Sequence, residues 1–227
     1  MHINRLHDWP ASEAEAVALQ HALRERVDVS APPPGPISLI AGCDIAYHLT
    51  EPRLFAAVVI LKMNDLSVVE ELTVSREVTF PYVPGLLSFR EVPALLELFS
   101  DLRHTPDAVM LDGQGIAHPR RFGLACHLGL WLDLPCVGCA KSWLVGDYAE
   151  PGRTAGEASP LSVDGAEVGA VVRSATGVKP VFVSPGHRTD IASATQLVRA
   201  TLSGYRHPAP TRAAHIAAGR SRAAAGV

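Results

Sequence analysis

Three β-like segments that follow one another at short spacing constrain the fold of this chain most strongly. They cover residues 37–47, 54–63 and 67–78, with Pro, Asn and Asp residues in the connections at 51–52 and 64–65. Such connections are typical of turns, and strands joined by short connections pair antiparallel. The sequence therefore predicts an antiparallel three-stranded meander in the first third of the chain.

Helices and short strands alternate after this meander. The predicted order is a helix at 88–102, a strand at 107–112, a helix from Pro119 to about 132, a strand at 135–140, a polar loop at 147–164, strands at 167–174 and 181–183, and helices at 189–202 and 211–225. This order predicts an α/β (α+β) fold of the ribonuclease-H-like type. Its mixed sheet has three antiparallel strands, then alternating helices and strands, with helices on both faces. Other α+β domains share the same order, so the order alone leaves alternatives.

The 227 residues can bury one core, and we expect a single domain over 1–227. Residues 1–36 read as an amphipathic helix followed by the stiff linker APPPGP, which can be neither helix nor central strand. Residues 205–227 read as a basic C-terminal helix. From Arg173 onward eight basic residues accompany one acid. Such an end can face phosphates, although a solvated basic tail explains it equally well.

Composition excludes several classes of protein. No run of about eighteen apolar residues is present, which argues against a membrane span. The N-terminal residues lack the pattern of a signal peptide, so we expect a cytoplasmic protein with reduced cysteines. Cys136 and Cys139 form a C-x-x-C pair without a second ligand pair, which favours buried, inert thiols over a metal or redox site.

Two apolar segments each end on an aspartate, which places carboxylates at the rim of the predicted sheet. ISLIAGCD ends on Asp44 and DAVMLD ends on Asp112. If these strands are neighbours, the like charges raise one pKa unless a cation lies between them. Glu91, in the first turn of a helix, can supply a third oxygen. Mg²⁺ prefers carboxylate oxygens, so the set favours a divalent cation, whereas each aspartate alone also fits a strand terminator or a helix cap.

The segment GQGIAHPRRFG, residues 113–123, directly follows Asp112. Its glycines allow a backbone to approach a ligand closely, and a helix that begins at Pro119 would present its N-terminus to a phosphate. His118 precedes this helix. Lys141 ends the next strand at the same rim, where a lysine either pairs with the carboxylates or donates to a phosphate oxygen.

Two further loops and one histidine complete the candidate features. FPYVPGLLSFRE, residues 80–91, is too rich in proline and glycine for a strand and holds an exposed ring, Tyr82, on a stiff turn. SPGHR, residues 184–188, is a tight loop in which Ser184 either helps to hold a phosphate or belongs to a simple turn. His127 lies inside an apolar helix and is interpreted as a core histidine.

Taken in order, these segments resemble bacterial endonuclease V. The resemblance runs from about residue 37 to 215 and rests on AGCDIAY, FPYVPGLLSFRE, LDGQGIAHPRRFG, LPCVGCAKSWL, SPGHR and GYRHPAPTRAAHI. It implies a ribonuclease-H-like fold and a Mg²⁺-dependent DNA repair nuclease, with Mn²⁺ as an alternative. The implied reaction is recognition of deoxyinosine and hydrolysis of the second phosphodiester bond 3′ to the lesion, leaving a 3′-hydroxyl and a 5′-phosphate.

The resemblance also implies roles for individual residues. Tyr82 matches the tyrosine of a strand-separating wedge, where a rigid ring can replace lost base stacking. Gln114 and Cys139 depart from the family pattern, but neither is an implied ligand. The implied metal ligands are Asp44, Glu91, Asp112 and His215; the implied catalytic residues are Asp44, Glu91, Asp112, His118 and Lys141; the implied nucleic-acid contacts are Pro81, Tyr82, Pro84, Gly85, Gly113, His118 and Lys141.

Two other functions stay open at this point. One is an inosine-specific ribonuclease, or another nuclease of the same fold, and the other is a non-catalytic inosine-binding module. Carboxylates without a cation would repel a phosphate, which disfavours the module. We expect a monomer whose partner is DNA containing deoxyinosine, with inosine-containing RNA as a second candidate and no membrane association.

Overall fold

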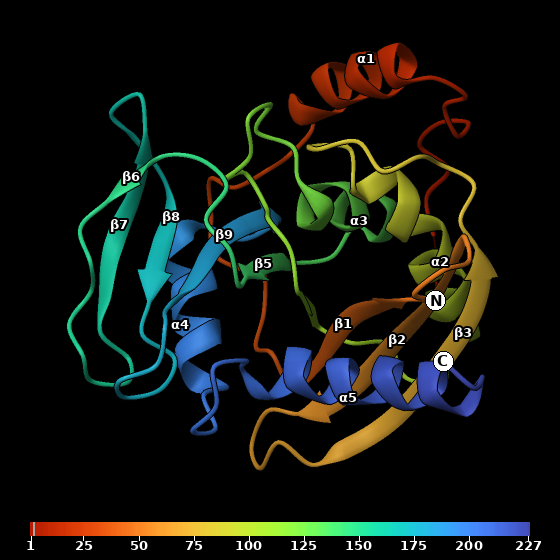
Figure 1. Cartoon of the computed structure of the whole chain (residues 1–227). Helices are drawn as coiled ribbons and strands as arrows, with labels where there is room; N and C mark the ends of the chain where they lie inside the picture. The colour runs from red at the N-terminus through yellow and green to blue at the C-terminus, as the bar shows by residue number, and fades with distance from the viewer. Residues whose placement is uncertain (2) are drawn as a thin grey trace.

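A computed structural model describes Met1 and residues 3–227 of the chain. The strands of the described residues form one sheet in the order β3-β2-β1-β4-β5-β9-β8-β7-β6 (Figure 1). They are β1 (Leu39–Tyr47), β2 (Arg53–Lys62), β3 (Val68–Glu77), β4 (Ala108–Leu111), β5 (Cys136–Ala140), β6 (Asp147–Tyr148), β7 (Ala158–Val163), β8 (Ala166–Val172) and β9 (Val181–His187).

The predicted meander is confirmed. β1 pairs antiparallel with β2, and β2 pairs antiparallel with β3. Burial follows the position of each strand: the interior of β2 is buried throughout, whereas residues of β3 alternate toward exposure at the sheet edge. β4 then joins β1 in parallel and β5 joins β4 in parallel. This mixed arrangement is the ribonuclease-H-like order that the sequence predicts.

Helices cover both faces of the sheet, as predicted. α2 (Ser88–Asp101) and α3 (Leu124–Leu132) pack on one face, and α4 (Ile191–Ala200) and α5 (Ala209–Ala224) pack on the other. Figure 1 shows α5 lying across β1, β2 and β3. α1 (Glu13–Arg24) buries Ala16 and Leu23 against the segments around α2 and α3. Successive side chains of β1 point to opposite faces of the sheet. Ala41 packs in the cluster that includes α2 and α3, and Ile40 packs in the cluster that includes α4 and α5.

Three local predictions are wrong. No helix begins at Pro119: residues 118–121 form bends and a turn, Arg121 adopts a left-handed φ of 57°, and α3 begins after Gly123. The left-handed residue breaks any right-handed helical run before it can reach α3. The predicted loop at 147–164 contains β6 and β7, and the predicted SPGHR loop lies largely within β9.

Other predictions are confirmed. His127 is fully buried in α3, where its ring contacts Ser88 and His7. The four cysteines are free and buried, and burial raises the pKa of the Cys126 thiol to about 12. Such thiols stay protonated and unreactive near neutral pH. Among the described helices, none combines the length and the apolar character needed to cross a membrane.

Candidate active site

Asp44 and Asp112 lie side by side at one edge of the sheet. β1 and β4 are parallel neighbours in which Cys43 faces Leu111, so the next residue of each strand is an aspartate. The backbone N–H of Asp112 donates to the carbonyl of Cys43 at 3.2 Å. Each aspartate side chain is 9% exposed, which leaves it at the rim rather than sealed in the core. The structure therefore brings the two carboxylates together as the sequence predicts.

Glu91 adds a third carboxyl group from the first turn of α2. Its side chain is buried and accepts a hydrogen bond of 2.9 Å from the hydroxyl of Tyr47. The pKa of Glu91 is raised to about 8, mainly by burial and also by the negative charges of Asp44 and Asp112, while the hydrogen bond from Tyr47 acts in the opposite direction. Tyr47 is a site residue that sequence reasoning missed, although it ends the AGCDIAY motif.

Lys141 and His215 contact the two aspartates. Lys141, at the end of β5, places its Nζ 2.6 Å from Oδ2 of Asp112. His215, in α5, places Nδ1 2.7 Å from Oδ2 of Asp44. The pKa of Asp44 is raised to about 6, mainly by burial and also by the charge of Asp112, while His215 and Lys141 act in the opposite direction. Each carboxylate thus has a partner that partly neutralises it.

The chemistry of these donors fits a hard divalent cation such as Mg²⁺. Asp44, Asp112 and Glu91 supply oxygen donors. Burial and, to a smaller extent, mutual repulsion raise the pKa values of Asp44 and Glu91, and a bound cation would lower both. Among the described residues, no three His, Cys, Asp or Glu side chains are spaced to hold a metal ion as they stand. Lys141 and His215 occupy aspartate oxygens, so a cation has to compete with these two contacts.

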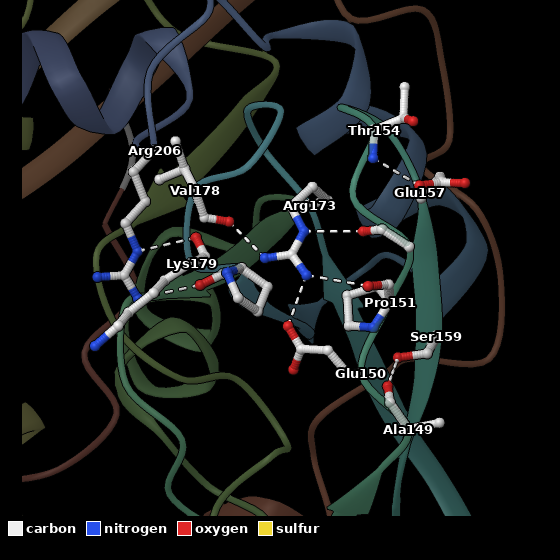
Figure 2. A network of polar contacts seen from close by, with 12 residues as sticks. Ala149, Glu150, Pro151, Thr154, Glu157, Ser159, Arg173, Val178, Lys179 and Arg206 are labelled. Atoms are coloured by element: carbon white, nitrogen blue, oxygen red, sulfur yellow. Dashed lines mark hydrogen bonds and ion pairs between the residues drawn. The ribbon is translucent and has the colours of Figure 1, made fainter.

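Arg206 positions the strand end that carries Lys141. Its guanidinium donates to the backbone carbonyls of Lys141, Lys179 and Pro180. Figure 2 shows the half-buried Arg206 reaching Lys179 and, nearby, the buried Arg173, which donates to Glu150 and Pro151. The GYRHP segment contains both Arg206 and a second missed residue, His207, whose ring lies 5.2 Å from that of His215. The motif GYRHPAPTRAAHI contains Arg206, His207 and His215, but the family resemblance implies a role for His215 alone.

The approach of α5 to β1 depends on Gly42. A Cβ atom built at this position would lie 1.9 Å from the carbonyl oxygen of Pro210, in the first turn of α5. No other residue type allows the helix to lie this close to the strand. The contact fixes α5 two residues before Asp44 in β1, and it thereby brings His215 to the aspartate.

The proline-rich loop presents Tyr82 to solvent. Phe80 is buried and anchors the loop, and Arg90 of α2 donates to its carbonyl at 2.9 Å. The ring of Tyr82 is 72% exposed, with the Arg90 guanidinium 5.9 Å from its centroid. Pro81 and Pro84 restrict the backbone on both sides of the ring. A rigid, exposed ring at this position is the arrangement that the sequence predicts.

A cavity of about 180 Å³ lies beside this loop. It is lined by Gln20, Tyr82, Val83, Pro84, Gly85, Leu87, Ser88, Gln114, His118, Phe122, Gly123, Leu124 and Leu144. Three segments of its wall are continuous in sequence with residues of the carboxylate cluster described above. Residues 82–88 lead to Glu91, Gln114 lies two residues after Asp112, and Leu144 lies three residues after Lys141. Gln114, rather than the predicted Gly113, lines this cavity.

His118 and Gly85 form a fixed part of the cavity wall. The carbonyl of Gly85, whose φ of 80° suits glycine, accepts hydrogen bonds from Gln20 and Arg120. Nε2 of His118 lies 3.1 Å from the same carbonyl, and its Nδ1 accepts from the backbone of Arg120. Burial and the charge of Arg120 lower the pKa of His118 to about 4, so the ring is neutral at pH 7. Both ring nitrogens have partners within the protein, which makes His118 part of the cavity wall.

Ser184 makes a structural contact, which disfavours the phosphate contact that the sequence left open as one of two alternatives. Its side chain is fully buried in β9, and its hydroxyl accepts a hydrogen bond of 2.8 Å from the backbone N–H of Gly115. The hydroxyl therefore fastens the segment after Asp112 to β9, and it does not face solvent.

The chain is similar to many endonuclease V proteins. The Endonuclease V family model matches residues 21–216. The endonuclease V of Nostoc punctiforme is 45% identical over 214 residues, covering 94% of this chain and 97% of that protein. The endonuclease V of Roseiflexus castenholzii is 45% identical over 216 residues, covering 95% of this chain and 96% of that protein.

Solved structures agree with this assignment. The endonuclease V of Streptomyces avermitilis is 43% identical with a TM-score of 0.91, and each chain is covered completely. The catalytic domain of human endonuclease V is 33% identical with a TM-score of 0.86, covering 96% of this chain and 99% of that chain. Ciona intestinalis endonuclease V, in complex with a 23mer DNA containing an inosine followed by a ribo-adenosine, is 26% identical with a TM-score of 0.82, covering 93% and 97%. This chain belongs to the endonuclease V family.

Proposed function

We propose that this chain is a Mg²⁺-dependent DNA repair endonuclease that recognises deaminated adenine, with Mn²⁺ as an alternative cation. It hydrolyses the second phosphodiester bond 3′ to the deoxyinosine and leaves a 3′-hydroxyl and a 5′-phosphate. The observation that carries the proposal is the pairing of Asp44 and Asp112 at adjacent strand ends, with Lys141 at 2.6 Å from Asp112. The inosine-containing DNA bound by the Ciona relative supports the choice of lesion.

The residues of the centre have distinct tasks in this proposal. Asp44, Asp112, Glu91 and His215 would hold the cation, and Tyr47 would fix the orientation of Glu91 through its hydrogen bond. A bound Mg²⁺ polarises a phosphate and lowers the pKa of a bound water. Lys141 is 38% exposed, so it can turn from Asp112 toward a phosphate and neutralise charge that develops on its oxygens.

The cavity beside the centre would receive the extruded base. Base-modifying and base-removing enzymes take their target out of the stack and read its exposed edge in a pocket. Hypoxanthine presents an acceptor at O6 and a donor at N1, whereas adenine is reversed at both atoms. A pocket whose polar groups are fixed, as Gly85 is by Gln20 and Arg120, rejects the reversed pattern because its own groups would be left unpaired.

Tyr82 would fill the gap that the extruded base leaves. Its ring is exposed, and the loop that carries it is held by the burial of Phe80 and by Arg90. Stacking of one base on an aromatic ring is worth about 1–3 kcal/mol, which offsets part of the energy needed to open the duplex. A preorganised loop loses little entropy when the ring inserts.

A strand-nicking assay on one defined inosine duplex tests this proposal. The duplex is labelled on the inosine strand, and the product ends are mapped at increasing Mg²⁺ concentration. We expect cleavage at the second bond 3′ to inosine and none on the matched adenine duplex. An inosine-containing RNA of the same sequence tests the ribonuclease alternative. Binding of inosine DNA without cleavage at millimolar Mg²⁺ would support the binding-module alternative instead.

Two isosteric variants test the assignment of the acidic centre. Asp44→Asn and Asp112→Asn keep the side-chain shape but remove the charge, and we expect each to lower nicking by more than about 100-fold while inosine binding persists. Asp65→Asn is the control, because Asp65 lies in an exposed turn and its carboxylate accepts from the nearby Ser67 backbone. Nicking at the wild-type rate by Asp112→Asn would refute the assignment.

A further inference from the structure

The segment that joins β5 to β6 exposes two adjacent apolar side chains. Trp143 is 55% exposed and Leu144 is 41% exposed. Large apolar side chains that share one exposed patch are typical of interaction sites, whereas isolated ones are ordinary surface. Trp143 and Leu144 are therefore candidates for contacting a ligand, and the neighbouring residues indicate its chemical class.

Hydrogen bonds hold the indole of Trp143 in place. Its Nε1–H donates to the carbonyl of Gly146 at 2.8 Å. The carbonyl of Ser142 accepts from the buried side-chain amide of Gln114 at 3.0 Å, which fastens the segment to the strand end after Asp112. A ring held in this way loses little conformational entropy when a flat ligand packs on it.

Trp143 lies between the acidic centre and the base cavity along the chain. Lys141, two residues before it, pairs with Asp112, and Leu144, directly after it, lines the cavity. Tyr82, another exposed aromatic ring, lines the same cavity, whereas Trp143 itself does not. Trp143 is therefore the exposed aromatic residue of a short segment that reaches the acidic centre at one end and the cavity at the other.

We propose that Trp143 stacks on the base immediately 3′ to the inosine, which rests on the function proposed above. If the scissile bond is the second one 3′ to the lesion, one nucleotide lies between the extruded base and the reacting phosphate. Its base has lost the stacking of the extruded neighbour and needs a new flat partner. Trp143 provides that surface and sets the distance from cavity to centre, so it is a specificity-determining contact of the nuclease.

Fluorescence of 2-aminopurine tests the contact directly. The fluorescent base replaces the nucleotide 3′ to inosine, and an otherwise identical probe carries it on the 5′ side. Binding is measured in the Asp112→Asn background to prevent cleavage. We expect the 3′ probe to be quenched on binding, and Trp143→Ala to abolish this quenching and weaken binding by about 5- to 100-fold. The 5′ probe should respond equally with and without Trp143.

Three further variants separate stacking from general effects. Trp143→Phe keeps a flat ring and should retain most of the quenching, whereas Trp143→Leu keeps an apolar side chain without a flat face and should lose it. Trp9→Ala removes another exposed tryptophan, one that stacks on Trp131, and should leave the quenching unchanged. Thermal unfolding of each variant confirms that it is folded.

The outcomes also separate this inference from the proposed function. If wild-type protein nicks inosine DNA at the expected bond but Trp143→Ala quenches the 3′ probe normally, the stacking contact is refuted and the nuclease proposal stands. If wild-type protein does not nick inosine DNA at all, the nuclease proposal fails whatever the probe reports. Equal loss of quenching in the leucine and phenylalanine variants would also refute stacking.

Discussion

Replacing Gly42 by alanine perturbs the contact that places α5 on β1. The added Cβ would lie 1.9 Å from the carbonyl oxygen and 2.2 Å from the carbonyl carbon of Pro210. Both are backbone atoms, so no side-chain rotation relieves the overlap. To reach an ordinary contact, the first turn of α5 has to move outward by roughly 1.5 Å.

Two opposing effects determine how much Gly42→Ala changes the free energy of unfolding. Overpacking of this kind costs about 1–3 kcal/mol, and a glycine-to-alanine change inside a strand returns about 0.5–1 kcal/mol of backbone entropy. Because the overlap at 1.9 Å is with backbone atoms, the upper part of the overpacking range, about 2–3 kcal/mol, applies, and the free energy of unfolding should fall by roughly 1–2.5 kcal/mol. The same displacement stretches the 2.7 Å hydrogen bond between His215 and Asp44, so inosine nicking should fall as well.

Urea unfolding and nicking, measured side by side, check this prediction. Gly219→Ala is the matched control, because Gly219 lies in the same helix with nothing within 4 Å of an added Cβ. Removing a glycine from a helix interior should stabilise the protein by about 1 kcal/mol and leave nicking unchanged. If Gly42→Ala proves as stable as wild type, or if both variants shift stability in the same direction, the reasoning from the helix contact is refuted.

Three further predictions concern other parts of the molecule. Burial would raise the pKa of Glu70, but hydrogen bonds from His104 and Arg103 outweigh it and lower the pKa from an ordinary 4.5 to about 2. The carboxylate therefore stabilises the fold above pH 4.5, and that contribution is lost as the pH falls toward 2. Between pH 2 and 4.5, the urea midpoint of unfolding should change less with pH for Glu70→Gln than for the wild-type protein. Parallel pH dependences of the two midpoints would contradict the stabilising role of the Glu70 carboxylate. Tyr82→Ala should weaken binding to inosine duplex more than to inosine single strands in a fluorescence titration, whereas equal losses would exclude a wedge. Arg206→Lys should leave some carbonyls unpaired, lower urea stability by about 1–3 kcal/mol and reduce nicking; unchanged values for both would show that Arg206 does not hold Lys141.

Local patterns in the sequence predict most of the strand and helix order. The turn residues between the first three strands and the alternating apolar segments act within a few residues, so their consequences can be read locally. The convergence of Asp44 and Asp112 was also predictable, because an aspartate after each of two buried strands meets its counterpart when the strands pair. The same reasoning predicted that Lys141, at the end of the neighbouring strand, lies close to the aspartates.

Tertiary contacts decided the features that the sequence did not predict. Pro119 fits the first turn of a helix, but Gly123 and Gly115 pack so closely that the chain turns before α3 begins. The residues 184–187 look like a loop because they contain proline and glycine, yet pairing with β5 extends them as a strand. The hydrogen bond from Tyr47 to Glu91 crosses from β1 to α2, and no local pattern specifies it.

The position of α5 in the chain has a consequence for protein synthesis. His215 follows Asp44 by 171 residues, and every strand of the sheet is made before the helix that carries it. At about 5–20 residues per second, roughly 10–30 s pass between the two residues on the ribosome. A growing chain therefore carries its first aspartate, and later its second, without the histidine that pairs with the first. The pair of Asp44 and His215 can therefore form only after α5 has been translated.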